Sequence, residues 1–330
     1  MLRTTGIWQD VAELPATLAA TIEARAGVAD TAALLDGAGV RRIVATGNGA
    51  AYYVAHALWL ASLEGRPGPE VVAVPSGLVA RGGFAWRPGD RLLAVSSSGE
   101  FRDLVEATQA LDASYAAVTA TPGSTVGSGA ASAALVTVLH QRAVTHTQAF
   151  CGAVAAALAV WAELTGDTAL RGALERLPDA VAGAVESAAQ WADEVPELAP
   201  SFAVAFGSGP AWAAALEAAL LLKEVADVPA EGLETREGAT SAMFALHPGH
   251  LVLTLPIADD PLLDEAAAIC AARGATVVRA PAPTVDRRLA AISTFPAAVA
   301  LSARIGLERG IDVDRPTWVD AYYDVARTSE

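Results

Sequence analysis

A run of hydroxyl residues and a glycine directly follows an apolar segment near residue 95. Residues 91–95 predict a buried strand, and the amphipathic pattern of residues 104–111 predicts a helix. The residues between them include Ser96, Ser97, Ser98, Gly99 and Glu100. The first amides of a helix have no partner within it, and the helix dipole adds positive charge there. This arrangement predicts a binding site for an anion or a sugar. The structural alternative is that Ser98 caps the helix and Glu100 assists in its first turn.

A Gly-x-Gly sequence ends each of two other predicted strands. Gly47-Asn48-Gly49 follows the short predicted strand at residues 42–46, and Gly207-Ser208-Gly209 follows the one at residues 202–206. A helix is expected after each, over residues 50–63 and 210–225. Neither copy completes the dinucleotide pattern Gly-x-Gly-x-x-Gly, because tyrosine and tryptophan stand at the third glycine position. Close packing of a helix explains these glycines as well as a ligand does.

The order of predicted elements repeats in the two halves of the chain. After each glycine pair comes an apolar strand that ends in a polar turn, then a helix, then a further strand at residues 115–119 or 276–278. Alternating strands and helices predict a parallel sheet covered on both faces. We therefore expect an α/β protein with two tandem doubly wound, flavodoxin-like parallel-sheet domains. Because ligands bind where strand order reverses, the turns at 47–49 and 96–99 can converge on one pocket.

Four segments are predicted along the chain. Residues 1–35 form an N-terminal helical segment, and residues 36–165 form the first sheet domain. Residues 166–196 are an alanine-rich helical linker that contains Pro178 and Pro196. Residues 197–330 form the second sheet domain with a C-terminal tail.

Composition and charge restrict the class of partner. The chain has 22 basic and 37 acidic residues, a net charge of −15, which disfavours binding to nucleic acid or to an anionic membrane.

Cys151 and Cys270 lie in apolar helical patterns and are expected to be buried thiols in a reducing compartment. The N-terminus lacks the apolar core of a signal peptide. The longest apolar run, at 149–161, is shorter than the roughly 20 residues of a spanning helix. We expect a cytoplasmic protein with a small-molecule ligand.

Five segments, in order over nearly the whole chain, match the motifs of one known family. They are Gly47–Ala51, Ser96–Asp103, Val144–Phe150, Ala215–Glu231 and Arg309–Pro316. In these segments the chain resembles the double sugar-isomerase (SIS) domain family. That family includes the isomerase half of glucosamine-6-phosphate synthase and the fructosamine-6-phosphate deglycases. The resemblance implies the SIS-type fold, a sugar or sugar phosphate as ligand, no cofactor, and a homodimer or higher homo-oligomer.

The resemblance also implies a set of ligand-binding residues. These are Gly47, Asn48, Gly49, Ser96, Ser97, Ser98, Gly99, Glu100 and Val144. Two departures remove hydroxyl donors, because Ala51 replaces the family serine and Phe101 replaces the family threonine. A net hydrogen bond is worth about 1 kcal/mol and more to a charged acceptor, so phosphate affinity falls about tenfold to a thousandfold. The sequence leaves open whether the ligand contains phosphate.

The catalytic positions are only partly filled. In the family the base is the glutamate of Leu-Lys-Glu, which is Glu224 here. The ring-opening histidine is replaced by Thr240, and a lysine of the same helix as the base is replaced by Leu221. His146 replaces a sugar-contacting serine and can supply an acid near neutral pH. The structural alternatives are a solvated Glu224 beside Lys223 and a His146 bonded to backbone at a helix start. The histidines show no metal-ligand spacing, so no metal site is predicted.

Two classes of function remain. The first is an enzyme, an aldose–ketose isomerase or a fructosamine deglycase that acts on a sugar phosphate or an amino sugar. The second is a catalytically impaired SIS protein that binds a sugar or serves regulation. A variant of the first is an isomerase that acts on a non-phosphorylated sugar in specialised metabolism.

Overall fold

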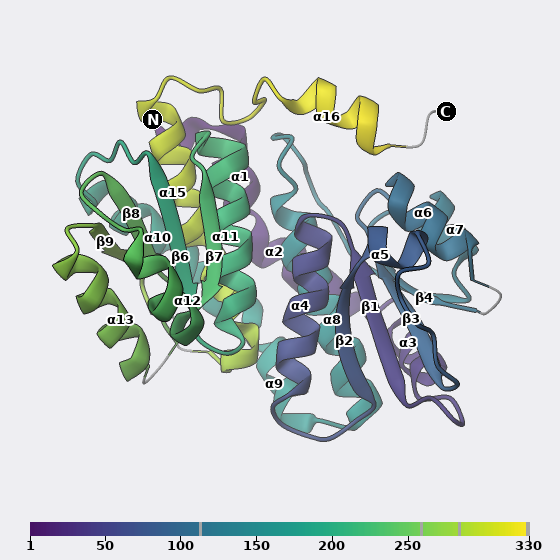
Figure 1. Ribbon diagram of the computed structural model, residues 1–330. Helices are drawn as coiled ribbons and strands as arrows, with labels where there is room; N and C mark the ends of the chain where they lie inside the picture. Colours follow the sequence, from purple (N-terminus) through teal and green to yellow (C-terminus); the bar gives the residue numbers. More distant parts are fainter. Residues whose placement is uncertain (112–113, 258–259, 283–284, 328–330) are drawn as a thin grey trace. The chain divides into compact units, whose positions relative to one another are not determined.

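The computed structural model describes residues 1–111, 114–257, 260–282 and 285–327, which form two compact units (Figure 1). The four-stranded unit contains Met1–Pro15, His140–Thr147 and Leu177–Thr317. The five-stranded unit contains Ala16–Leu139, Gln148–Arg176 and the chain from Trp318 on. The name of each unit refers to its sheet, and both sheets are parallel throughout.

The sheet of the five-stranded unit has the order β2-β1-β3-β4-β5. Its strands are β1 (Arg42–Gly47), β2 (Glu70–Pro75), β3 (Asp90–Val95), β4 (Ala116–Thr119) and β5 (Ser132–Leu135). Its helices are α2 (Leu14–Ala24), α3 (Val28–Leu35), α4 (Ala50–Ser62), α5 (Ser76–Ala80), α6 (Arg102–Gln109), α7 (Thr125–Gly129), α8 (Thr147–Thr165), α9 (Thr168–Glu175) and α16 (Val319–Ala326). Because β2 and β3 pair with opposite edges of β1, the strand order reverses between β1 and β3.

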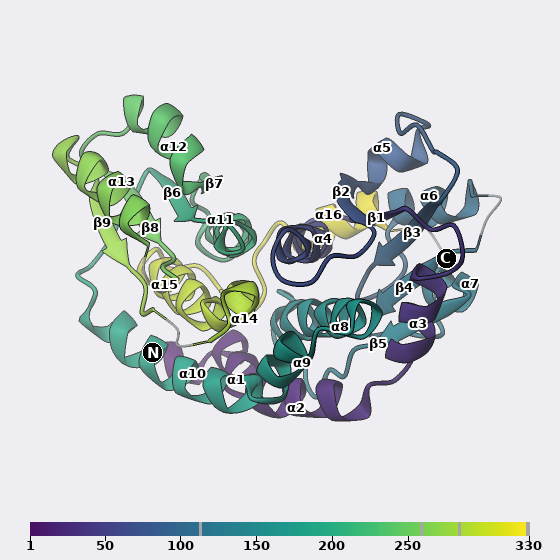
Figure 2. The same ribbon diagram turned by 90° about the horizontal axis from the view of Figure 1, so that it is seen from below.

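Both faces of this sheet are covered by helices (Figure 2). Val44 and Leu92 pack in one cluster with Val79 of α5, Leu104 of α6 and Val126 of α7. Helix α4 packs on β1 and β2, and α3 packs on β4 and β5. Because β1 is buried along its whole length, its central residues 43–45 are apolar without alternation.

The sheet of the four-stranded unit has the order β7-β6-β8-β9. Its strands are β6 (Phe202–Gly207), β7 (Ala230–Glu234), β8 (His250–Thr254) and β9 (Thr276–Arg279). Its helices are η1 (Leu2–Thr4), α1 (Gly6–Ala12), α10 (Leu177–Glu194), α11 (Ala211–Ala226), α12 (Thr235–Ser241), η2 (Ala242–Phe244), α13 (Pro261–Ala272), η3 (Arg287–Leu289), α14 (Ala290–Ser293) and α15 (Phe295–Glu308). Helix α11 packs on β6, β7 and α15, while Leu263 and Cys270 of α13 pack in the cluster that contains Phe206 of β6. The predicted α/β class with two doubly wound parallel sheets is confirmed.

Within the part of the chain that the structure describes, two helical segments are long and apolar enough to span a membrane by length and composition alone. They are Thr147–Thr165 and Arg287–Glu308, and 83% and 94% of their apolar windows are buried inside the protein. This burial is typical of core helices. Cys151 and Cys270 are both buried and form no disulfide, as expected.

We predict that Gly207→Ala destabilises the four-stranded unit by about 1–3 kcal/mol, the usual cost of overpacking. A Cβ on Gly207 would lie 2.1 Å from the backbone oxygen of Ala211, because α11 starts directly against the end of β6. Backbone cannot move aside as a flexible side chain can. Chemical denaturation measures the change, and Gly183→Ala on α10 is the control. A Cβ on Gly183 meets nothing within 4 Å, so an equal loss of stability in both variants would contradict the packing argument.

Candidate sugar-binding and acid–base site

The glycine turn lies at the point where strand order reverses in the five-stranded unit. Strand β1 ends at Gly47, and its neighbour β3 ends at Val95, directly before the serine run. Asn48 accepts a hydrogen bond from the hydroxyl of Ser76, which is buried at the start of α5 after β2. The carboxyl ends of β1, β2 and β3 therefore bring the 47–49 turn and the 96–100 loop to one edge of one sheet, as expected.

The serine loop is held in place by its own side chains and by the start of α7. The hydroxyl of Ser96 is buried and accepts the Gly99 N–H at 2.9 Å. Gly99 has a φ of +70°, and a Cβ there would lie 1.9 Å from the Ser124 hydroxyl. The carbonyl of Ser97 accepts a hydrogen bond from the Thr121 hydroxyl at 3.0 Å. The loop is therefore shaped before any ligand binds.

The structure does not support Ser98 as the cap of the following helix. Helix α6 begins at Arg102, and its N-cap residue is Phe101, which makes no side-chain cap hydrogen bond. The Ser98 hydroxyl instead accepts the Glu100 N–H at 3.4 Å. Glu100 turns to α7, where its carboxylate accepts the Thr125 N–H at 2.7 Å and the Thr125 hydroxyl at 2.8 Å. Glu100 thus fastens the loop to α7, and the structural alternative for Ser98 is wrong.

The C-terminal helix α16 contacts the residues that follow the serine loop. The rings of Phe101 and Tyr322 lie 6.0 Å apart, and Phe101 forms an antiparallel β-bridge with Arg327. The guanidinium of Arg102 donates to the carbonyl of Val325 at 2.6 Å. Where the related family has a threonine donor, this chain therefore has an aromatic contact with its own tail.

Two glutamates of α11 are buried to different degrees in the four-stranded unit. Glu224 is half-buried, and its burial raises the pKa of the carboxyl to about 7, against the opposing charge of Lys223. Glu217 is only 3% exposed, and burial together with the charge of Glu224 raises its pKa well above the usual value. Leu221 lies between them and is completely buried. A carboxyl that titrates near pH 7 suits a general base at neutral pH.

The segment that contains Val144 and His146 is fastened to the four-stranded unit by two aspartates. The carboxylate of Asp10 accepts the Arg142 N–H at 2.7 Å and the Ala143 N–H at 3.1 Å. The backbone carbonyl of Asp314 accepts the Val144 N–H at 2.9 Å. The Asp314 carboxylate also accepts the first two N–H groups of α1, both at 2.7 Å. The tail motif around Asp314 thus joins α1 to the segment that positions His146.

His146 is half-buried between two buried threonines, directly before α8. Thr145 and Thr147 are 7% and 2% exposed. Among the described residues, neither threonine hydroxyl has a hydrogen-bond partner. Buried hydroxyl groups without a partner are uncommon, and they are suited to a polar ligand or to water.

Thr240 does not provide the missing acid. Its hydroxyl bonds the carbonyls of Glu237 at 2.9 Å and Arg236 at 3.2 Å within α12. A hydroxyl used in this way stays with the helix backbone and cannot shuttle a proton near neutral pH.

Comparison with known proteins finds similar solved structures but no match by sequence. No protein-family model and no curated protein matches the chain. The C-terminal domain of glucosamine-fructose-6-phosphate aminotransferase from Francisella tularensis has a TM-score of 0.81 at 18% identity, covering 95% of this chain and 98% of that chain. Glucosamine-6-phosphate deaminase from Thermotoga maritima has a TM-score of 0.77 at 17% identity, with coverages of 95% and 98%. Tagatose-6-phosphate ketose/aldose isomerase from Escherichia coli has a TM-score of 0.74 at 18% identity, with coverages of 95% and 96%.

The chain has the SIS fold. On this fold the predicted residues fall into two groups, each described within its own unit. The five-stranded unit brings together Gly47, Asn48 and Gly49 with Ser96 to Glu100. The four-stranded unit contains Val144, His146 and Glu224.

Sequence reasoning assigned no role to Glu217, Asp10 or Asp314, although Glu217 and Asp314 lie in segments that match the SIS pattern. The available signal for Glu217 was a single acidic residue within the otherwise apolar residues 211–222 of α11. Asp10 had no such signal, because its partners lie far away in the sequence.

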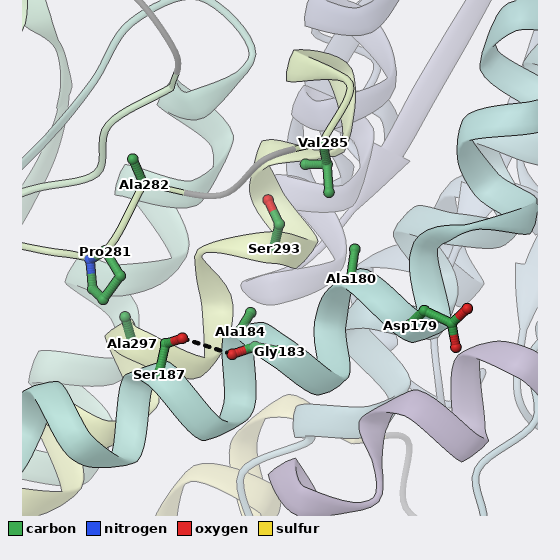
Figure 3. A pocket seen from close by; sticks show the side chains of 10 residues that line it. All are labelled: Asp179, Ala180, Gly183, Ala184, Ser187, Pro281, Ala282, Val285, Ser293 and Ala297. Atoms are coloured by element: carbon green, nitrogen blue, oxygen red, sulfur yellow. Dashed lines mark hydrogen bonds between the residues drawn. The ribbon is translucent and has the colours of Figure 1, made fainter.

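A cavity of about 360 Å³ lies elsewhere in the four-stranded unit of this SIS fold (Figure 3). It is lined mainly by small side chains of α10, α14 and α15, and Ser187 uses its hydroxyl for the Gly183 carbonyl at 2.8 Å. None of the residues predicted from the sequence lines it. The described residues also contain no group of three histidine, cysteine or acidic side chains that could hold a metal ion.

Proposed function

We propose that this protein is a sugar-phosphate or amino-sugar enzyme of the aldose–ketose isomerase or fructosamine deglycase type. The observation that carries the proposal is Glu224, a half-buried carboxyl whose pKa is raised to about 7 on α11 of the SIS fold. Solved proteins with this fold include an isomerase and a deaminase of sugar phosphates by name. The sequence match at Leu-Lys-Glu supports the same position.

Glu224 is proposed as the general base. Both reaction types break a C–H bond next to a carbonyl or imine, and the electron pair moves toward that group. An ionised carboxylate accepts the proton and returns it to the neighbouring carbon. A base with a pKa near 7 is half-ionised at neutral pH and remains a strong proton acceptor.

His146 is proposed as the acid. Thr240, which stands where the family has its ring-opening histidine, cannot serve as one. An imidazole titrates near neutrality, so it can donate a proton to the ring oxygen or to the developing oxyanion. Its place between two buried threonine hydroxyls without partners supports contact with a polar ligand.

The serine loop and the glycine turn are proposed to bind the sugar or its phosphate. The loop lies at the edge of the sheet where strand order reverses, which is where doubly wound sheets bind ligands. Homo-oligomer formation is proposed on the resemblance alone.

A second candidate is a sugar-binding protein without turnover. It is favoured by the completely buried Leu221 and by the Thr240 hydroxyl that bonds the backbone of α12. A third candidate, an isomerase for a sugar without phosphate, is favoured by Ala51 and by the contact of Phe101 with Tyr322.

Two measurements distinguish these candidates. Thermal shifts with fructose 6-phosphate, fructose and inorganic phosphate report which ligand binds. NMR in D2O reports exchange of the proton next to the carbonyl. Binding with exchange is expected, and the preferred sugar then decides whether phosphate is required. Binding without exchange would support the second candidate, and the absence of both would overturn the proposal.

We predict that Ala51→Ser raises the affinity for fructose 6-phosphate about tenfold over that for fructose, because it restores one hydroxyl donor to a charged acceptor. Ala51 is half-buried in the first turn of α4, directly after the glycine turn. Calorimetric Kd values for both sugars measure the effect. Ala110→Ser, on an exposed residue after α6, is the control. An unchanged ratio of the two affinities would show that the turn does not bind the phosphate.

A further inference from the structure

Glu217 is a buried carboxyl, and one of its two oxygens lacks a hydrogen-bond partner among the described residues. The residue is 3% exposed, and this oxygen is Oε2. A charged carboxylate in such a place is costly, so it requires a cation, several donors or a bound proton.

The neighbours of Glu217 along α11 do not supply a cation. Residues spaced by four and seven positions share one face of a helix, so Leu221 lies one turn from Glu217 and Glu224 lies two turns from it on the same face. Leu221 is apolar and completely buried. Glu224 carries the same sign of charge when both groups are ionised, so its charge favours the neutral form of Glu217. Lys223 lies on the exposed side of the helix.

The elements packed against α11 do not supply one either. Helix α14 and strand β6 contain no charged residue. In β7 the exposed Glu231 and the helix-capping Glu234 are acidic. In α15 the guanidinium of Arg304 bonds Glu308 at 2.8 Å and the carbonyls of Ala192 and Val195. A bound proton is the remaining way to keep Glu217 in its site.

We propose that Glu217 keeps its proton while Glu224 is ionised, so that α11 presents one base and one neutral carboxylic acid. Glu217 is then a positioning residue that acts through Glu224. Its proton keeps a second negative charge away from the oxyanion that develops when the substrate loses its C–H proton. The catalytic part of this inference rests on the proposed function, whereas the bound proton does not.

The bound proton has a signature in folding that needs no substrate. The unfolded carboxyl has its proton only below about pH 4.3, so above about pH 5 unfolding releases a proton that folded Glu217 holds. The unfolding equilibrium constant then rises about tenfold for each pH unit from this one group. Glu217→Gln removes this dependence, because a glutamine has no proton to release.

The experiment compares wild type, Glu217→Gln and Glu265→Gln by chemical denaturation at several pH values above 5. Glu265 is exposed on α13 of the same unit and serves as the matched control. The expected result is a slope of log K against pH that is one unit smaller in Glu217→Gln than in wild type and the control. Carbon-13 NMR titration of the glutamate carboxyls in wild type gives the same answer if the variant does not fold. Equal slopes, or a Glu217 carboxyl that titrates near pH 4, would overturn the inference.

A pH–rate profile tests the catalytic part. Wild type is expected to gain activity as Glu224 ionises and to lose it at higher pH as Glu217 ionises. Glu217→Gln should retain the first change and lose the second, so its activity stays level in the alkaline range. An alkaline decline that persists in Glu217→Gln would overturn the positioning role. If neither wild type nor any variant exchanges the substrate proton, the proposed function is overturned. The pH dependence of the unfolding equilibrium constant would still report the proton on Glu217.

Discussion

Glu224→Gln is expected to lower proton exchange and turnover by about 10²–10⁴-fold, the usual contribution of a general base. Glutamine keeps the size of the side chain and cannot accept the proton. The NMR exchange assay and an isomerisation assay measure the loss. Glu265→Gln, the same substitution on an exposed helix of the same unit, should leave both rates unchanged. Equal rates for wild type and Glu224→Gln would remove Glu224 from the mechanism.

The pH dependence of this residue has a definite sign. Its carboxyl has a pKa of about 7 in the fold, above the usual value, because burial disfavours the charged form. Activity that requires the ionised base should therefore rise with pH through about 7. The effect of Glu224 on stability has the opposite sign, since a raised carboxyl pKa makes unfolding easier as pH rises from about 4.3 toward the folded value.

Asp10→Ala is expected to destabilise the four-stranded unit by about 2–4 kcal/mol, because two backbone N–H groups lose their acceptor. Asp10 is 1% exposed, and its carboxylate holds the N–H groups of Arg142 and Ala143. The same change releases the segment that positions His146, so turnover should fall further than the loss of folded protein explains.

Urea denaturation and the specific activity of the folded fraction check both parts of this prediction. Asp193→Ala is a suitable control, because the Asp193 side chain is 70% exposed and lies 4.0 Å from Arg3. Exposed ion pairs contribute little, so the control should match wild type. A variant at Asp10 as stable as the control would show that the aspartate does not hold the segment.

The amino-acid pattern was sufficient where the signal is local. Apolar runs followed by glycine, serine or other polar turns predicted β1, β3, β6 and β8, and the glycine turns predicted the helices that follow them, α4 and α11. Strands β2, β5 and β7 were not singled out. Strand β7 reads Ala-Glu-Gly-Leu-Glu, and it forms because β6 offers an edge with which it pairs from Ala230 to Glu234. Strand propensity depends strongly on such context.

Long-range contacts decided the details of the site. The sequence offered Ser98 as a helix cap, whereas in the fold Glu100 reaches α7 and α6 begins without a side-chain cap. The sequence showed Phe101 as the replacement of a family threonine, whereas in the fold its ring meets Tyr322 of the tail. These pairs are separated by many residues, and no local periodicity reports them.

The sequence by itself determined the class of this protein, because turn residues at the ends of apolar runs dictate parallel strands joined by helices. It also singled out the loops and the glutamate proposed for the site, since residue type sets which groups can bind an anion or accept a proton. Only the tertiary structure decided how far Glu217 and Glu224 are buried and how Asp10 and Asp314 anchor the segment that contains His146. Burial and hydrogen bonding set those properties, and both arise only when distant segments pack together.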